Sequence, residues 1–263
     1  RFRNFREEGV MKSVHKFFLL LCLVASAQAL SVERDPMAIR IEAQMQMPDR
    51  HKWDLRRDEP RKPYQTFRFL GLREGMVAMD IGAYAGYTTE MLAAAVGPTG
   101  RVYSQHREEV LSDYADGYYK RAMNERLANN RLPNVVLHIS EYDSLGLEGQ
   151  LDFAFLGNML HDFYYRDGEE TALAFLASMK AALKPGGVLG VMDHVGVAGN
   201  ENKELHRIEP QIARTLLSRA GFVIDAESDL FSNPSDDHSL MVYDKSIYLY
   251  TDKFLFRAVN PKN

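Results

Sequence analysis

The stretch from residue 76 to residue 89 constrains the fold of this chain more than any other. It reads Met-Val-Ala-Met-Asp-Ile-Gly-Ala-Tyr-Ala-Gly-Tyr-Thr-Thr. The apolar start is typical of a buried strand, and the glycines indicate a tight turn into a helix that begins near Gly86. Glycines let the backbone approach a ligand, a helix N-terminus offers free N–H groups, and Asp80 places a carboxylate at the strand's carboxyl end. The stretch therefore predicts a nucleotide pocket, although many α/β turns carry two glycines.

Strand and helix signals alternate along the rest of the chain. The expected helices are 63–72, 86–96, 108–130, 168–183 and 210–220. The further expected strands are 101–104, 134–139, 151–156, 188–192, 222–226 and 253–259. This alternation predicts an α/β fold, in which a parallel sheet carries helices on both faces. Tyr118 and Tyr119 are expected in the core, because a helix that covers a sheet needs a large apolar face.

The beginning of the chain has the pattern of a secretory signal peptide. From Met11 a basic start leads into an apolar run, and the small-x-small triplet Ala27-Gln28-Ala29 follows. The apolar run is too short for a stable transmembrane helix. We therefore expect 11–29 to be a signal peptide, 1–10 to precede the true start, and the mature protein to be exported, either periplasmic or secreted, with no stable membrane insertion.

The remaining residues predict an N-terminal arm and one domain. Residues 30–62 mix charges with prolines and cannot form a core of their own, so we expect them to wrap the domain formed by 63–263. Cys22, the single cysteine, lies in the predicted signal, so the mature domain has no disulfide. The chain carries a net charge of −4, and the predicted mature part is more acidic still, which excludes non-specific binding to nucleic acid.

Four motifs follow one another in the order found in class I S-adenosylmethionine-dependent methyltransferases. They are Asp80-x-Gly82-x-x-x-Gly86, the turn 97–102, the segment 156–162 and Leu183-Lys184-Pro185-Gly186-Gly187. The chain resembles this family over roughly residues 61–259. The resemblance implies a Rossmann-like methyltransferase fold with a seven-stranded sheet, parallel except for an antiparallel last strand at 253–259. It also implies that S-adenosylmethionine binds over the carboxyl ends of the first strands.

A narrower group of exported, predicted methyltransferases shares further motifs with this chain. They are Asn158-x-x-His161-Asp162, Asp193-His194, Leu205-His206-Arg207-Ile208 and Asp236-Asp237-His238. The last of these lies in the long connection 229–252, and a loop of that length in a compact domain is more often functional than idle.

The resemblance assigns cofactor contacts, with two departures. It implies contacts from Asp80, Gly82, Ala83, Tyr84, Gly86, His106, Glu141 and Asn158, with Asp143 as the alternative to Glu141 near the adenine. Tyr84 stands where many members have another glycine, and its phenol either crowds the methionine part of the cofactor or forms a wall against it. Gln105-His106 stands where the family places an acid that holds both ribose hydroxyls. A carboxylate accepts two hydrogen bonds, whereas a neutral imidazole offers one donor and one acceptor. Both departures point to weaker cofactor binding.

Residues that follow different strands of a parallel sheet converge at one edge, and here they carry catalytic chemistry. We expect His161 to be a general base oriented by the carboxylate of Asp162, with Asp193 and His194 as a second such pair at the same edge. A histidine that caps the next loop is the plainer alternative. A metal held by His161, His194, His206 or His238 is a further alternative, but no tight ligand spacing supports it, so no metal is assigned.

The function expected from these patterns is transfer of a methyl group from S-adenosylmethionine to a small molecule. The alternative is a degenerate methyltransferase fold whose crevice binds a metal or small ligand, either as a hydrolase or as a non-catalytic binding protein. Fold alone cannot separate these functions.

Overall fold

The computed structural model describes residues 34–262, of which those from Pro36 onward belong to one compact unit. The predicted signal peptide and the residues before it lie outside the described part. Within 34–262, no helix combines the length and the apolar character needed to cross a membrane.

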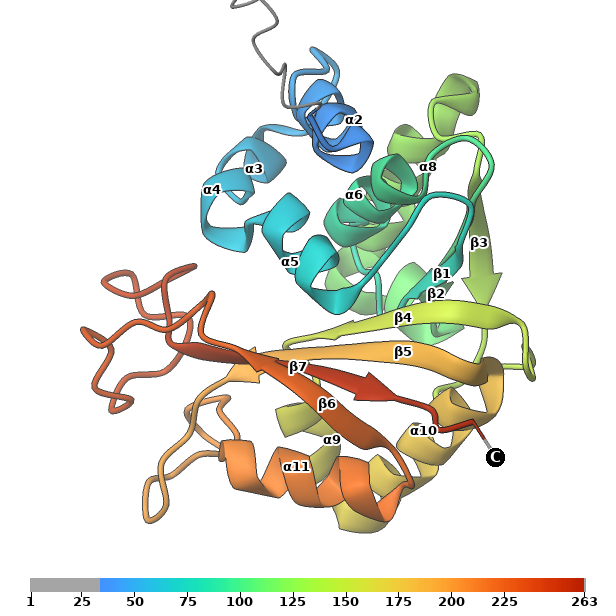
Figure 1. The fold of residues 1–263 in the computed structure, drawn as a ribbon. Coiled ribbons are helices and arrows are strands. Elements are labelled where there is room, and N and C mark those ends of the chain that lie inside the picture. Colours follow the sequence, from blue (N-terminus) through green and yellow to red (C-terminus); the bar gives the residue numbers. More distant parts are fainter. Residues whose placement is uncertain (1–33, 263) are drawn as a thin grey trace, which may run out of the picture. The chain divides into compact units, whose positions relative to one another are not determined.

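A seven-stranded sheet forms the centre of the described part (Figure 1). The strands are β1 Val77–Asp80, β2 Arg101–His106, β3 Val135–Ile139, β4 Leu151–Gly157, β5 Leu183–His194, β6 Val223–Ser228 and β7 Lys253–Val259. Their order is β3-β2-β1-β4-β5-β7-β6, and β7 runs antiparallel to both of its neighbours. The predicted sheet, parallel except for its last strand, is confirmed.

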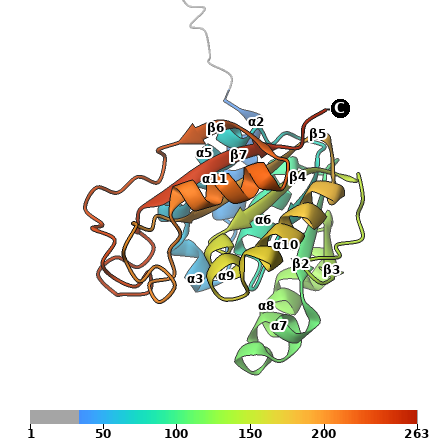
Figure 2. The same cartoon turned by 90° about the horizontal axis from the view of Figure 1, so that it is seen from below.

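Helices cover both faces of the sheet (Figures 1 and 2). The main ones are α2 Pro36–Met45, α5 Pro63–Leu70 and α6 Tyr87–Val96 on one face, and α9 Leu160–Tyr165, α10 Glu169–Ala182 and α11 Pro210–Arg219 on the other. The period-two alternation of β4 supplies both layers. Phe153 and Phe155 pack with α5 and α6, whereas Ala154 and Leu156 join the cluster that contains α10.

The expected long helix at 108–130 is wrong. The structure has α7 Glu108–Ser112, a short 3₁₀ turn at Tyr114–Gly117, α8 Tyr118–Leu127 and a second 3₁₀ turn at Ala128–Asn130. Gly117 adopts a φ of 72°, a left-handed conformation that a continuous helix cannot contain. Tyr118 is therefore exposed and Tyr119 half-buried, not in the core as expected.

The strand expected at 188–192 is longer than predicted, because the preceding turn joins it. Leu183 pairs with Leu151, and after an irregularity Val188 pairs with Phe153. Gly186 adopts a φ of 85° within this irregularity, and its N–H bonds to the Asn260 carbonyl at 2.7 Å.

The part of the predicted arm that the structure describes lies against the domain. It contains α2 and two short helices, α3 Lys52–Leu55 and α4 Asp58–Arg61. The Arg40 guanidinium of α2 donates hydrogen bonds to the carbonyls of Ala94 and Ala95 at the end of α6, both at 2.9 Å. The Asp54 carboxylate of α3 is buried against Arg126 of α8 at 2.7 Å. Hydrogen bonds and ion pairs therefore hold these residues on the domain.

Candidate active site

A cavity of about 1370 Å³ opens at the carboxyl edge of the sheet. Its wall includes residues 80–88 around the glycine turn, then Arg61, Asn158, Asp162, His194, His206, Tyr243, Tyr248 and Lys253. Small-molecule sites usually occupy 300–1,000 Å³. This cavity can therefore hold a nucleoside cofactor and a second small ligand together.

The glycine turn is shaped by close packing behind it. Gly82 and Gly86 adopt φ angles of 57° and 79°, which disfavour other residues. A Cβ atom on Gly82 would lie 2.5 Å from the sulfur of Met159, and one on Gly86 would lie 2.6 Å from the sulfur of Met123. The Gln105 side chain accepts the Gly82 N–H at 2.9 Å. The turn, including Ala83, therefore forms a fixed backbone surface on the cavity wall that fits a ligand of the predicted kind.

Tyr84 contributes its ring to the same wall. It adopts a φ of 50°, an uncommon conformation for a residue with a side chain. The ring packs against Tyr119 with 5.1 Å between centroids, and burial raises the pKa of its hydroxyl. Tyr84 therefore presents a neutral phenol to whatever fills the cavity.

Asp80 lies in the wall at the end of β1, whereas His106 does not reach it. A chain of hydrogen bonds joins the two side chains through the hydroxyls of Thr89 and Ser104. Burial raises the pKa of Asp80 to about 6 and lowers the pKa of His106 to about 4. His106 and Ser104 are two residues apart in β2 and share one face of the strand, so the His106 ring is buried beside Ser104. The cavity wall therefore does not include the predicted ribose contact.

The residues that follow β2, β3 and β4 do line the cavity. Arg107 and Glu141 form an ion pair at 2.7 Å, and both belong to the wall, as does Asp143. Asn158 adopts a φ of 56°, and its side-chain carbonyl oxygen is buried with no hydrogen-bond partner in residues 34–262. An unpartnered acceptor in a cavity wall suits a ligand that donates a hydrogen bond.

Asp193, and not the adjacent Asp162 that the sequence predicts, orients His161. One carboxylate oxygen of Asp193 accepts the backbone N–H of His161 at 2.9 Å, and the other lies 2.8 Å from His161 Nδ1. This contact places the imidazole proton on Nδ1 and leaves the electron pair on Nε2. Burial disfavours the charged ring, but Asp193 outweighs it, so the pKa of His161 is raised above its ordinary value.

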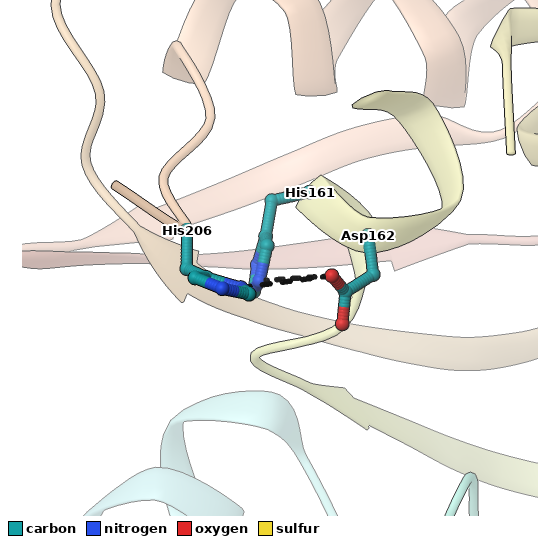
Figure 3. Close-up of side chains that lie close together, drawn as sticks. All are labelled: His161, Asp162 and His206. Atoms are coloured by element: carbon teal, nitrogen blue, oxygen red, sulfur yellow. Dashed lines mark ion pairs between the residues drawn. The ribbon is translucent and has the colours of Figure 1, made fainter. Parts of the chain in front are cut away.

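Asp162 and His206 lie close to the His161 ring (Figure 3). His161 Nε2 lies 3.6 Å from Asp162 Oδ1, and His206 Nδ1 lies 3.7 Å from the same oxygen. In the described part of the chain, both nitrogens are buried without a hydrogen-bond partner. Asp162 and His206 belong to the wall, whereas His161 lies behind it.

His194 is the second buried histidine of the site. Its Nδ1 lies 2.7 Å from the Thr251 hydroxyl, and its ring lies 6.1 Å from that of His161. Burial, together with the charge of Lys253, holds the pKa of His194 well below its ordinary value. His194 is therefore a neutral hydrogen-bonding group in the wall.

Other motif residues hold the connection between β6 and β7 in place instead of facing the cavity. The fully buried Arg207 guanidinium makes two hydrogen bonds of 3.0 Å to the Asp236 carboxylate. His238 Nε2 lies 2.9 Å from Asp252. The connection so held supplies Val242, Tyr243, Tyr248 and Leu249 to the wall.

Arg61 and Lys253 line the cavity, although sequence reasoning did not identify them. Lys253 pairs with His194 across the antiparallel strands β5 and β7, and Arg61 ends α4 of the arm. A basic residue at the start of the last strand is a weak signal. The position of Lys253 in the site becomes clear only from the strand register, which places it opposite His194.

Less than half of the chain matches a methyltransferase family. Residues 32–144 match the family model described as protein-L-isoaspartate(D-aspartate) O-methyltransferase. Over 53 residues the chain is 42% identical to the protein-L-isoaspartate O-methyltransferase of Methanothrix thermoacetophila. That match covers 20% of this chain and 25% of the relative, so the chain spans about a quarter of the relative's length.

Solved methyltransferase structures share the whole fold. A S-adenosylmethionine-dependent methyltransferase from Aquifex aeolicus has a TM-score of 0.56 at 21% identity, over 86% of this chain and 98% of that one. The N,N-8-amino-8-demethyl-D-riboflavin dimethyltransferase from Streptomyces davawensis has a TM-score of 0.53 at 16% identity, over 79% and 55%. The chain therefore has the fold of S-adenosylmethionine-dependent methyltransferases, and its family match covers the glycine turn and the first three strands.

Proposed function

We propose that this protein transfers a methyl group from S-adenosylmethionine to a small-molecule acceptor. The carrying observation is that the glycine turn and the Asp162, His194 and His206 side chains line one cavity. A cavity of about 1370 Å³ leaves room for a small acceptor beside the cofactor. The match to protein-L-isoaspartate methyltransferases ends before β4, and so it does not cover Asp162, His194 and His206.

The side chains present suit removal of a proton from the acceptor. Bound S-adenosylmethionine supplies an electrophilic methyl group, and the acceptor needs an in-line approach and a base. We assign the base to His161, because Asp193 keeps its Nδ1 protonated and stabilises the imidazolium that forms. Because His161 does not line the cavity, the Asp162 carboxylate, which does, would take the proton from the acceptor and pass it to Nε2, 3.6 Å away.

Titration and kinetics of single variants test this function. Calorimetry should detect binding of S-adenosylmethionine to the protein. His161→Ala should lower turnover by about 100-fold and leave cofactor affinity within a few-fold. His138→Ala is the matched control, because His138 bonds to the Leu145 carbonyl and does not line the cavity. Absence of cofactor binding by the unaltered protein would refute the function, and unchanged turnover in His161→Ala would refute the base.

We also propose that the protein is exported, with residues 11–29 as its signal peptide. The basic start, the short apolar run and Ala27-Gln28-Ala29 support this proposal. Mass spectrometry of the exported protein should find an N-terminus at or near Leu30. A mature chain that retains residues 11–29 would contradict it.

A second candidate function, metal-dependent hydrolysis, rests on one specific cluster. Ligand atoms of His161, Asp162 and His206 all lie within 4.8 Å of one another. A histidine that donates its other N–H to a carboxylate, as His161 does to Asp193, is typical of metal ligands. Three protein ligands beside a cavity would leave a fourth position for water, as in catalytic zinc sites.

Metal analysis separates the two candidates. If the cluster binds metal, the protein should hold one equivalent of Zn²⁺, and Asp162→Asn and His206→Ala should each weaken binding by tenfold or more. A chelator should then abolish activity. If His161 is instead a base, a chelator should leave methyl transfer unchanged.

A further inference from the structure

Tyrosine side chains form a continuous strip along one side of the cavity. Tyr84 of the glycine turn packs against Tyr119 of α8, with 5.1 Å between the ring centroids. Tyr119 in turn stacks on Tyr114, with 5.7 Å between centroids and 5° between the ring planes. Tyr118 meets Tyr119 edge-on at 5.5 Å. All four residues belong to the cavity wall, and we call them the tyrosine strip.

The strip forms because the helix expected at 108–130 is interrupted. Tyr114 lies in the 3₁₀ turn before α8, and Gly117 ends that turn with a φ of 72°. In a continuous α-helix, residues five positions apart point about 140° away from each other. The left-handed turn at Gly117 instead allows the rings of Tyr114 and Tyr119 to stack. Tyr114 is 62% exposed, so the strip runs from the glycine turn to the protein surface.

The hydroxyl groups of the strip are not used to hold the fold together. Within residues 34–262, neither the Tyr84 hydroxyl nor the Tyr119 hydroxyl forms a hydrogen bond with another residue. By contrast, Tyr87 donates its hydroxyl to Asp58 at 3.1 Å, and Tyr250 donates its own to Glu59 at 2.8 Å. Those two tyrosines fasten α4 of the arm, whereas the rings of the strip remain available to a ligand.

The strip adjoins Asp162, because β1 and β4 are neighbouring strands. The segments that follow these strands pack on each other, and a Cβ atom on Gly82 would lie 2.5 Å from the Met159 sulfur. The Met159 carbonyl accepts the backbone N–H of Asp162 at 3.1 Å. Tyr84 follows Gly82 by two residues, so Tyr84 and Asp162 line adjoining parts of the cavity wall.

A further tyrosine lies beside the proposed base. The Tyr243 ring lies 5.3 Å from the His206 ring, which lies 5.5 Å from the His161 ring. Asp162 lies 3.7 Å from His206. Tyr243 comes from the connection between β6 and β7 and lines the cavity. The cavity therefore has aromatic rings both at the glycine turn and beside the groups that can remove a proton.

We propose that the methyl acceptor is a phenol whose aromatic ring stacks on the tyrosine strip and whose hydroxyl faces Asp162. This assignment rests on the proposed function and names its substrate class. Aromatic rings attract one another through their faces and edges, beyond the apolar area that they bury, so a wall of tyrosine rings favours a planar aromatic ligand over a saturated one.

The acid–base groups of the site favour a phenol over an alkyl alcohol. A phenol ionises at about pH 10, as the tyrosine side chain does, and gives up its proton far more readily than an alkyl alcohol. That proton passes to Asp162 and on to His161. The phenol oxygen bonds to the methyl carbon while that carbon's bond to sulfur breaks. The products are a methyl ether and S-adenosylhomocysteine.

A matched pair of ligands tests the aromatic site. 2-Naphthol and decahydro-2-naphthol share the carbon skeleton and the hydroxyl, but only 2-naphthol is planar and aromatic. Calorimetry with the S-adenosylhomocysteine-saturated protein should show that 2-naphthol binds about tenfold more tightly. Tyr119→Leu should weaken 2-naphthol binding by about fivefold or more and leave decahydro-2-naphthol binding within about twofold. Tyr119→Phe, which keeps the ring, should bind 2-naphthol within about twofold of the unaltered protein.

Control variants separate ring binding from proton removal. Tyr250→Leu removes an exposed tyrosine of the same connection as Tyr243 that lies outside the cavity wall, and it should change neither affinity. Asp162→Asn should bind 2-naphthol within a few-fold of the unaltered protein but form 2-methoxynaphthalene about tenfold more slowly or less, as mass spectrometry would measure. Circular dichroism checks that each variant is folded.

Four outcomes would overturn parts of this assignment. Equal affinity for the two ligands, or unchanged 2-naphthol affinity in Tyr119→Leu, would refute the aromatic site. Displacement of S-adenosylhomocysteine by 2-naphthol would show that the strip holds the cofactor nucleoside and not the acceptor. Tight binding of 2-naphthol without methyl transfer would refute the phenol. If the unaltered protein binds no S-adenosylhomocysteine, the proposed function fails, and 2-naphthol titration of the free protein still decides the aromatic site.

Discussion

At the scale of single residues, the site is governed by how many donors each buried carboxylate receives. Asp193 accepts the backbone N–H groups of His161 and His194 and lies 2.8 Å from His161 Nδ1. Asp80 accepts the hydroxyl and the backbone N–H of Thr89, but burial outweighs them and raises its pKa to about 6. A carboxylate with several donors is stabilised in its charged form, whereas one with few donors is destabilised by burial. The two acids should therefore respond in opposite ways to neutralisation.

Asp80→Asn should stabilise the ligand-free protein near pH 8. The folded pKa of about 6 exceeds the unfolded value of about 3.9, so folding favours the protonated acid. Wild-type stability is therefore lost as pH rises from about 4 to 6, by at most about 3 kcal/mol. The asparagine variant should escape this loss, and its advantage in urea unfolding should be larger at pH 8 than at pH 5. A variant less stable than wild type at pH 8 would contradict the prediction.

Asp193→Asn should destabilise the protein, because an amide cannot accept every hydrogen bond that the carboxylate receives. Leaving buried N–H donors unpaired costs about 1–3 kcal/mol. Urea unfolding should show this loss, and turnover should fall because the His161 tautomer is no longer fixed. Asp162→Asn is the matched control, since Asp162 is only partly buried and should change stability by less than about 1 kcal/mol. Equal stability of the two variants would show that the contacts of Asp193 carry no special weight.

At the scale of elements, the connection from β1 to α6 shapes one wall of the cavity. Gly86 precedes α6 with a φ of 79°, and Met123 and Arg126 of α8 press against it. Met123 is buried, and Arg126 is held by the Ala85 carbonyl at 2.9 Å, so neither can move freely. The shape of the turn therefore depends on α8 as well as on its own sequence.

Gly86→Ala and Gly149→Ala separate backbone strain from crowding. Both glycines adopt a positive φ, 79° and 63°, but a Cβ at Gly149 meets nothing within 4 Å. Gly149→Ala should cost about 1 kcal/mol, the cost of the left-handed conformation. Gly86→Ala should cost about 1–3 kcal/mol more, because it overpacks α8, and it should also weaken S-adenosylmethionine binding. Urea unfolding measures the loss of stability, and calorimetry measures the loss of affinity. Equal losses of stability in the two variants would show that Met123 and Arg126 move aside without cost.

At the scale of the whole domain, a buried ion network ties the arm to the core. Glu90 of α6 is fully buried and pairs with Arg126, with Arg131 at 2.6 Å and with Arg50 at 3.6 Å. Arg126 also reaches Asp54 in α3 at 2.7 Å. The same arm supplies Arg61 to the cavity wall, so the arm contributes to both the ion network and the cavity.

Glu90→Gln should destabilise the domain and loosen the arm. Removing one partner of a buried ion pair leaves uncompensated charge and costs about 3–5 kcal/mol. Urea unfolding should show the loss, and limited proteolysis should cleave residues 34–62 faster. Glu227→Gln, which breaks an exposed pair with Arg214, should cost less than about 1 kcal/mol. Similar behaviour of the two variants would mean that the network does not hold the arm.

Local rules made much of the fold and part of the site predictable. The apolar run before Asp80 and the conformational freedom of Gly82 and Gly86 act over a few residues, so β1, the turn and α6 can be read directly. The convergence of His161 with Asp193 follows from the common direction of parallel strands. The seven-stranded sheet and the antiparallel β7 were expected from the family resemblance, whereas the strand order comes from the structure.

The tertiary structure decided which partner each polar group meets. His106 contacts the Ser104 hydroxyl, Arg207 is hydrogen-bonded to Asp236, and Lys253 pairs with His194 across β5 and β7. Strand register and loop packing bring these residues together. A sequence pattern, by contrast, indicates only the type of an element and the period of its apolar residues. The sequence by itself determined a ligand-binding α/β sheet with a histidine and aspartate edge. Only the packing of the arm and of the 229–252 connection decided which cations and aromatic rings close the cavity, because burial and charge neutralisation are properties of the assembled chain.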